Sequence, residues 1–181
     1  DTFTVNWASK GEGALPGLDL NAYLDDNQYL RTAGFRTYGE EARTHGADAK
    51  LTSRFGRHKL EYGMNYSRQN VSVYNGTKTG TVDSTGYYNA GRETGTINGL
   101  FAQQTLALGE LFSAGLGVRQ DWYDYTDTHG QQFKQDGLSP NASLTFAPND
   151  AFSTRLSYAE AFRGAGPIEA YLIDVGPGTA V

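Results

Sequence analysis

The chain has 181 residues, a formal net charge of −5 and no cysteine, which excludes a disulfide framework and thiolate metal sites. Its mild acidity, with no basic stripe, argues against nucleic acid as a partner. No window is apolar enough for a membrane-spanning helix of about 20 residues, although a spanning β-strand needs only about 10. The 23 glycines and 12 tyrosines, against 5 prolines, favour strands joined by turns.

Apolar and polar side chains alternate along most of the sequence, which is the period of a β-strand and not of a helix. In the clearest run, from Phe112 to Trp122, the even positions are apolar apart from Gln120, whereas the odd positions are small, polar or charged until Tyr123. In chain order the pattern predicts eight strands, at about residues 2–7, 18–30, 42–55, 58–74, 95–108, 111–125, 137–147 and 151–162.

Short turns rich in Gly, Asn, Asp and Pro alternate with long polar connections. The short turns are Gly56-Arg57, Gly109-Glu110 and Pro148-Asn149-Asp150. The long connections are Tyr74–Thr94, Thr126–Asp136 and the segment from Arg163 onward. In an up-and-down meander this order places all short turns at one end of the sheet and all long loops at the other. Outer-membrane β-barrels have this asymmetry.

Apolar and polar side chains would also alternate in a soluble β-sandwich or lipocalin-like barrel, but three features favour a membrane barrel. Several predicted strands exceed ten residues, whereas strands of soluble proteins typically have about five or six. Charged side chains occupy the middle of the polar face, which a packed interior would reject. Aromatic side chains cluster near strand ends, as at Tyr62, Tyr66 and Trp122, and amphipathic rings suit the headgroup level of a bilayer.

Four segments of the C-terminal half resemble recurring strands of TonB-dependent outer-membrane receptors. Gly99-Leu-Phe-Ala-Gln-Gln-Thr-Leu is similar to "GYFAQDQ-x-L", and Phe112-Ser-Ala-Gly-Leu-Gly-Val-Arg-Gln-Asp is similar to "TAGLRYD". Leu138-Ser-Pro-Asn-Ala-Ser-Leu-Thr-Phe resembles "SPSLGLTYRP", and Leu156-Ser-Tyr-Ala-Glu-Ala-Phe-Arg resembles "ASYSRAFRAP". The segments follow the family's order and spacing, whereas the N-terminal half is similar in style alone.

The resemblance implies an all-β, antiparallel, up-and-down transmembrane barrel of the 22-stranded type in the bacterial outer membrane, with an N-terminal plug domain inside it. Residues 1–181 are then expected to form about eight strands of that barrel and no plug domain, as an internal piece of a longer chain. The plug region would contact the TonB complex, and outer-membrane lipid would surround the barrel. Eight strands can also close a small barrel, so a standalone outer-membrane barrel, structural or enzymatic, is an alternative.

The function that the resemblance implies is import of a ferric siderophore or related iron complex, without enzymatic activity and without a cofactor. Haem or another non-siderophore cargo is the alternative within the family, although no His follows Phe162-Arg163-Gly164-Ala165, near which haem receptors often place one. Such cargo is bulky, often anionic and rich in planar groups, so Arg and aromatic side chains near the external end are candidates for contact. They are Tyr87, Tyr88, Arg92, Tyr123, Tyr125, His129 and Arg163.

Three charged side chains are expected in the lumen of the barrel. Arg119, Asp121 and Arg155 fall on the polar face of their predicted strands, where we expect them to pair with neighbours or with the plug. The three histidines do not have the spacing of a metal site, so no bound structural metal ion is expected. No nucleophile elbow or catalytic triad is recognisable either.

Overall fold

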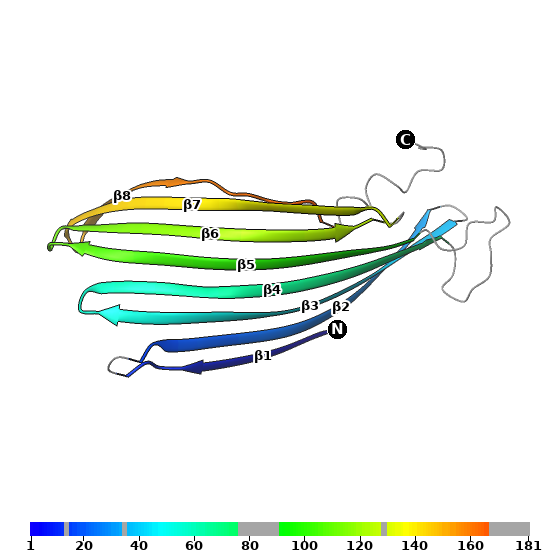
Figure 1. The fold of residues 1–181 in the computed structure, drawn as a ribbon, viewed down its shortest axis with the longest axis horizontal. Helices are drawn as coiled ribbons and strands as arrows, with labels where there is room; N and C mark the ends of the chain where they lie inside the picture. Colours follow the sequence, from blue (N-terminus) through cyan, green and yellow to red (C-terminus); the bar gives the residue numbers. More distant parts are fainter. Residues whose placement is uncertain (13–14, 34–35, 76–90, 128–129, 167–181) are drawn as a thin grey trace.

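The computed structural model describes residues 1–12, 15–33, 36–75, 91–127 and 130–166. They form one antiparallel sheet in which the strands follow the order of the sequence, each paired with the next (Figure 1). The strands are β1 (Thr2–Ser9), β2 (Gly17–Ala33), β3 (Arg36–Phe55), β4 (His58–Asn75), β5 (Gly91–Leu108), β6 (Phe112–Thr126), β7 (Gln132–Asn149) and β8 (Phe152–Ala159). Among the described residues, no helix is long and apolar enough to cross a membrane.

The predicted all-β meander is confirmed in strand number, order and direction, but most strands are longer than predicted. For example, β7 begins at Gln132 rather than at 137, and β3 begins at Arg36 rather than at 42. The added segments are polar, because hydrogen bonding between neighbouring backbones, and not apolar alternation, decides where pairing stops. The predicted strand up to residue 162 is wrong at its end: β8 stops at Ala159 and the chain then leaves the sheet.

The two ends of the sheet differ in their connections. At the end that we call the turn end, Gly56 and Gly109 adopt φ values of 60° and 77° in short hairpin turns. These left-handed conformations are strained for residues with a Cβ but not for glycine. At the opposite end, the loop end, β4 stops at Asn75 and β5 starts at Gly91, so the longest connection between strands lies there.

Strand pairing divides the side chains between two faces. One register row is mainly apolar and consists of Trp7, Leu20, Ala49, Met64, Leu100, Gln120 and Leu138. The residue beside each of these in its strand belongs to a polar row of Asn6, Asn21, Asp48, Asn65, Gly99, Asp121 and Gly137. Adjacent residues of a strand point to opposite faces, so the two rows lie on opposite sides of the sheet.

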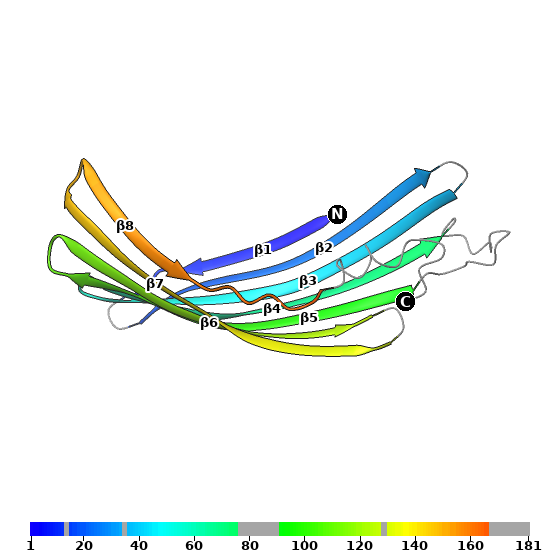
Figure 2. The same cartoon turned by 90° about the horizontal axis from the view of Figure 1, so that it is seen from above.

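The polar row lies on the concave face, which we call the lumen face. Figure 2 shows the sheet curved like a trough, with the segment after β8 on its concave side. That segment places the Phe162 ring against Gly137, a member of the polar row. The apolar row therefore lies on the convex face, where lipid surrounds a membrane barrel.

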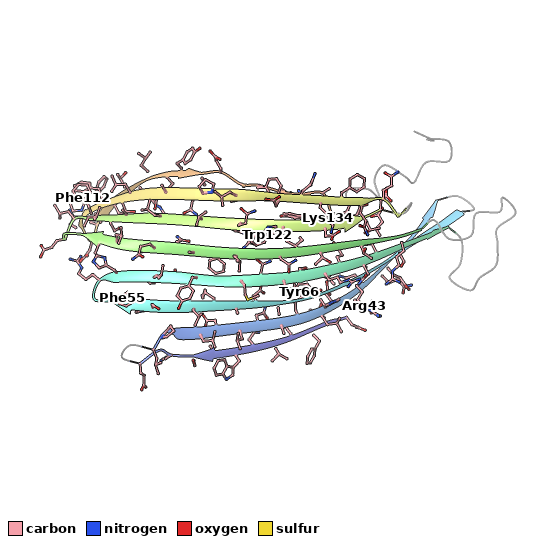
Figure 3. All side chains as sticks on the ribbon, viewed as in Figure 1. Arg43, Phe55, Tyr66, Phe112, Trp122 and Lys134 are labelled. Atoms are coloured by element: carbon pink, nitrogen blue, oxygen red, sulfur yellow. The ribbon has the colours of Figure 1, made fainter. Side chains whose placement is uncertain are left out.

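The convex face shows the layering expected across a bilayer. Leu156 and Leu138 are 75% and 55% exposed there, so they form a band that has no partner within the sheet. Figure 3 shows Phe55 and Phe112 near the turn end, with Tyr66 and Trp122 farther towards the loop end. A single-layer sheet has little core of its own, so contact of this band with hydrocarbon must supply much of its stability.

Candidate functional site

A short segment after β8 crosses the lumen face instead of extending the strand. β8 pairs with β7 as far as Ala159, opposite Asn141, although β7 itself extends back to Gln132. The Glu160 backbone N–H still donates to the Pro140 carbonyl oxygen at 3.0 Å. We call residues 160–166 the lumenal strap; it runs along the concave side of the sheet in Figure 2.

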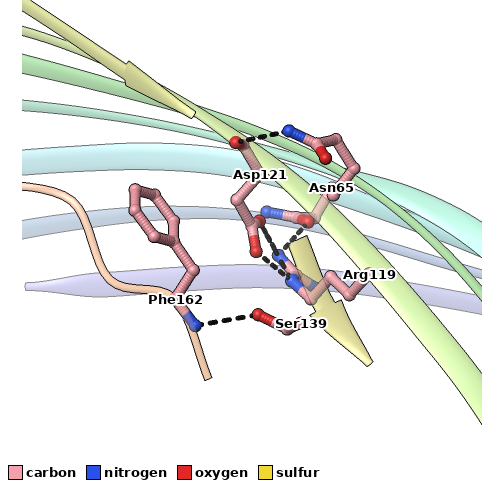
Figure 4. A network of polar contacts seen from close by, with 6 residues as sticks. Asn65, Arg119, Asp121, Ser139 and Phe162 are labelled. Carbon is pink, nitrogen blue, oxygen red and sulfur yellow. Dashed lines mark hydrogen bonds and ion pairs between the residues drawn. The ribbon is translucent and has the colours of Figure 1, made fainter. Parts of the chain in front are cut away.

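Side chains of β7 hold the backbone of the lumenal strap. The Phe162 N–H donates to Ser139 Oγ at 2.9 Å (Figure 4), and the Ala165 N–H donates to Gln135 Oε1 at 2.9 Å. Both acceptors occupy lumen-facing positions of β7, as their register shows. Because these bonds do not belong to the strand ladder, the strap can shift without unpairing the sheet.

Two aromatic rings fit the lumenal strap against the sheet. The Phe162 ring of the strap lies on Gly137 of β7, and the Tyr123 ring of β6 lies against Gly164 of the strap. At either glycine an added Cβ would overlap the facing ring, so the close approach requires glycine. The two rings also meet edge to face, with centroids 5.8 Å apart and planes at 70°, which is a favoured arrangement of aromatic pairs.

A pocket of about 420 Å³ lies between the lumenal strap and the sheet. Strands β4, β5 and β6 contribute Ser67, Gln69, Ile97 and Tyr123 to its lining, and the strap contributes residues 162–166. The volume falls within the lower part of the range of about 300–1,000 Å³ that is usual for small-molecule sites. Rings and glycines form part of the lining, and an amide and a hydroxyl form another part. A planar group could therefore stack there and accept or donate hydrogen bonds at its edge.

A cationic side chain of the lumenal strap contributes to the lining of the pocket. Arg163 belongs to the lining and is exposed. Asp124 also borders the pocket, but its register with Lys134 places both side chains on the convex face, where Lys134 Nζ lies 3.2 Å from the Asp124 carboxylate. Since the site is open to solvent, the attraction for an anion acts over roughly one Debye length, about 8 Å at physiological salt.

A second polar cluster lies on the lumen face, beginning in the next lumen-facing register row towards the turn end. Arg119 of β6 is 2.6 Å from Asp121 Oδ1 and donates to Asn65 Oδ1 of β4, also at 2.6 Å (Figure 4). The guanidinium group passes over Gly99 of β5, where an added Cβ would lie 2.5 Å from Arg119 Nη2. Asp121 is 3% exposed, so this pairing compensates a carboxylate whose burial would otherwise be costly. The cluster thus joins β4 to β6 across β5.

The structure brings two of the predicted ligand-contact residues together and separates a third. Tyr123 and Arg163 line the same pocket, from the sheet and from the lumenal strap. Tyr125 is 5% exposed and stacks on Phe133 with centroids 5.9 Å apart, so it supports the sheet next to the pocket. Arg92 pairs in register with Ser72, on the convex face and away from the pocket. Tyr87, Tyr88 and His129 lie outside the described residues.

The charged side chains predicted for the lumen lie on the concave face. Arg119 and Asp121 belong to the cluster described above, and Arg155 Nη2 donates to Ser143 Oγ at 3.1 Å. Within the described ranges, no three His, Cys, Asp or Glu side chains are grouped as metal ligands would be.

The sequence patterns did not single out most of the residues that build the pocket. Phe162 falls within the last predicted strand, and no function was assigned to Gly164. Gly137, Ser139 and Gln135 hold the lumenal strap through contacts across more than twenty residues of sequence. The available signal was the end of alternation after Ala159, followed by two glycines within three residues.

Comparisons with known proteins agree with this architecture. The family model "TonB dependent receptor-like, beta-barrel" matches residues 2–180, whereas no curated protein sequence matches the chain. The FrpB iron transporter from Neisseria meningitidis (F5-1 variant) is 19% identical with a TM-score of 0.69, over 86% of this chain and 27% of that one. The copper transporter OprC is 14% identical with a TM-score of 0.80, over 99% of this chain and 32% of that one.

The chain spans about a third or less of the length of these solved structures. At such identities the two structures show a shared fold, while the family model covers nearly every residue of the chain. The family consists of outer-membrane receptors and transporters of bacteria and not of enzymes. The chain belongs to the TonB-dependent receptor family, and its eight strands are part of the outer-membrane β-barrel of such a receptor.

Proposed function

We propose that this chain forms part of a receptor that binds a ferric siderophore at the external end of its lumen and imports it with energy from the TonB complex. The observation that carries the proposal is the pocket between the lumenal strap and strands β4–β6, which joins Tyr123 and Arg163. A ferric siderophore presents planar, electron-rich groups and often a negative charge. Aromatic rings and a guanidinium group are the side chains that suit such a surface.

The position of the pocket also supports this function. It lies on the lumen face near the end at which β4 and β5 are joined by their long connection. External loops of outer-membrane barrels lie at the end with long connections, so cargo arriving from outside would meet this part of the sheet first. Energy coupling would pass through a plug region, which is a separate part of receptors of this family.

The comparisons and the pocket both bear on the class of cargo. Of the two similar structures, one is titled an iron transporter and the other a copper transporter. The stacking surfaces of the pocket favour an organic chelate over a bare metal ion, and a ferric siderophore is such a chelate. Haem is the second candidate, but the segment after Arg163 contains no histidine to ligate its iron.

The test is a titration of the full-length receptor that contains this chain, refolded in detergent. Ferric siderophores of the catecholate and hydroxamate types, haem, cobalamin and a copper chelate would be added separately while Trp and Tyr fluorescence is recorded. The expected result is saturable, submicromolar quenching by a ferric siderophore. Quenching by haem alone or by the copper chelate alone would show that the receptor binds a different cargo. No response to any compound would contradict the receptor function.

A further inference from the structure

We infer that the lumenal strap has a second position, in which residues 160–166 continue β8 and pair with the open edge of β7, and that Pro140 is the residue that favours the lumenal position. In the lumen the strap forms one wall of the pocket, whereas in the sheet it completes the wall of the barrel. The second position needs no cargo, so it goes beyond the proposed function.

The pairing of β7 with β8 stops at Pro140 for a chemical reason. Asn141 is opposite Ala159, so the next register pair would be Pro140 and Glu160. In an antiparallel ladder the two residues of such a pair exchange two N–H···O bonds. The Glu160 N–H donates to the Pro140 carbonyl oxygen at 3.0 Å, but proline has no N–H to donate in return. The first pair of a continued ladder therefore has one hydrogen bond instead of two.

Beyond Pro140 the edge of β7 on the β8 side is open. The Pro140 carbonyl points to that side, so the backbone groups of the even-numbered residues Leu138, Asp136 and Lys134 point there as well. Among the described residues, no strand pairs with this side of β7 over residues 132–139. Leu138 belongs to the apolar row that faces lipid and is 55% exposed, and unpaired backbone groups are costly at that depth. The open edge therefore favours a strand as its partner.

The lumenal strap has the length and the position in sequence to be this partner. If the β7–β8 register continues without a shift, Phe162 falls opposite Leu138. Gly166 then falls opposite Lys134, close to the beginning of β7. Phe162 has the same parity as Leu156, so its ring would turn from the lumen to the apolar convex face beside Leu138. Because the strap directly follows β8, this pairing requires no further loop closure.

Two sets of contacts thus compete for the strap. In the lumen, the Phe162 N–H donates to Ser139 Oγ and the Ala165 N–H donates to Gln135 Oε1, while two rings pack against glycines. In the sheet, the strap would exchange these contacts for ladder bonds to β7, of which the one from Pro140 is missing. Its move into the sheet would also open the pocket, because the strap forms one side of it.

A disulfide can trap the second position in the full-length receptor once any cysteines elsewhere in it are replaced. While the strap is in the lumen, Lys134→Cys places a thiol on the convex face and Gly166→Cys places one on the lumen side. In the sheet the two residues would be direct partners with Cα atoms about 5.5 Å apart, which a disulfide can bridge. Neither side chain holds the strap, because Lys134 pairs with Asp124 and a Cβ at Gly166 meets nothing within 4 Å.

Pro140→Val supplies the missing N–H, and Pro148→Val is the matched control, because it makes the same change in β7 near the turn end. One added backbone hydrogen bond should make oxidative crosslinking of the cysteine pair about tenfold faster in Pro140→Val. Pro148→Val should stay within about twofold of the parent. Equal rates in Pro140→Val and the parent would show that Pro140 does not determine the position of the strap. No crosslinking in any variant would show that the strap does not pair with β7.

Hydrogen exchange at single-residue resolution tests the same equilibrium without cysteines. With the strap in the lumen, the amides of Lys134, Asp136 and Leu138 should exchange quickly, whereas the odd-numbered amides of this part of β7 bond to β6 and should exchange slowly. Pro140→Val should slow the even-numbered amides several-fold and leave the odd-numbered ones unchanged. Heat-modifiable gel migration shows that each variant is folded. Slow exchange of both sets in the wild type would contradict the open edge, and an unchanged pattern in Pro140→Val would contradict the second position.

Discussion

The polar cluster around Arg119 and the lumenal strap are neighbours on the lumen face, yet they are held in different ways. Arg119, Asp121 and Asn65 all belong to strands, and their ion pair and hydrogen bond of 2.6 Å compensate a buried carboxylate. The strap lies outside the strand ladder and is held by side-chain acceptors and two rings. The first arrangement makes the wall rigid, whereas the second allows a small segment to move on it.

We expect this difference to distinguish lumen residues that stabilise the fold from those that contact cargo. Charges that pair with one another across strands leave little for a ligand to bind, and removing one partner damages the wall. A segment fixed by contacts that can be broken singly can respond to cargo without unfolding the barrel. The following substitutions test this division, in order of decreasing expected effect.

Removing the cation of the Arg119 cluster should have the largest effect on stability. Arg119→Met would leave the Asp121 carboxylate, 3% exposed, without its ion-pair partner. We expect the free energy of unfolding in detergent and urea to fall by about 3–5 kcal/mol. Arg155→Met is the matched control: Arg155 is exposed and donates to a serine hydroxyl, so its loss should cost less than about 1 kcal/mol. Equal effects of the two variants would show that the cluster is not a special feature of the wall.

The two faces of the sheet should differ in their tolerance of charge. Leu116→Arg places a cation on the convex face, in the apolar band, and should reduce stability in lipid by about 2–4 kcal/mol near the midplane. Gln103→Arg, in the neighbouring register row of the lumen face, should change stability by less than about 1 kcal/mol. Refolding yield and urea unfolding in vesicles measure both. A similar loss for both variants would argue against the assignment of the convex face to lipid.

The sequence predicted cargo contact for both Arg163 and Arg92, but their replacement should affect the affinity for cargo differently. Arg163 lines the pocket, whereas Arg92 lies on the convex face. Arg163→Ala should weaken binding of an anionic ferric complex by about tenfold, equivalent to about 1.4 kcal/mol, and less at high salt. Arg92→Ala should leave the affinity within twofold of the wild type. The reverse ranking would place the cargo site elsewhere.

A single hydrogen bond of the lumenal strap should give the smallest measurable effect. Ser139→Ala removes the acceptor of the Phe162 N–H, which is worth about 0.5–1.5 kcal/mol. In an Ala165→Cys background we expect maleimide labelling from the external side to become several-fold faster, with no change in the urea unfolding curve. Ser139→Thr keeps the hydroxyl and should label at the wild-type rate. A loss of overall stability in Ser139→Ala would mean that the strap is part of the cooperative fold.

The fold could be predicted from the sequence because alternation with period two is a local property. This alternation predicted the strands. It also predicted that Arg119 and Asp121 face the lumen, because alternate residues of a strand share one face. Errors arose at strand ends, where polar residues continue the pairing. Arg92 is an example: it was expected at the base of a loop, but β5 begins at Gly91, and parity then turns Arg92 to the convex face.

The candidate site was less predictable because it depends on contacts between distant segments. The Phe162 ring meets Gly137, and Gly164 meets Tyr123, so each contact joins the strap to a strand far away in the sequence. Neither glycine differs in the sequence from those of turns or bends. The register across β6 and β7 must be known before these contacts can be inferred.

The most direct test of the central claim is a structure of the full-length receptor with its ferric complex bound. The expected result is a planar group of the complex in the pocket, beside Ser67, Gln69 and Ile97, with Arg163 near its oxygens and Arg92 distant from it. A complex bound elsewhere in the lumen or loops, with this pocket empty and the strap unchanged, would contradict both the site and the function assigned to it.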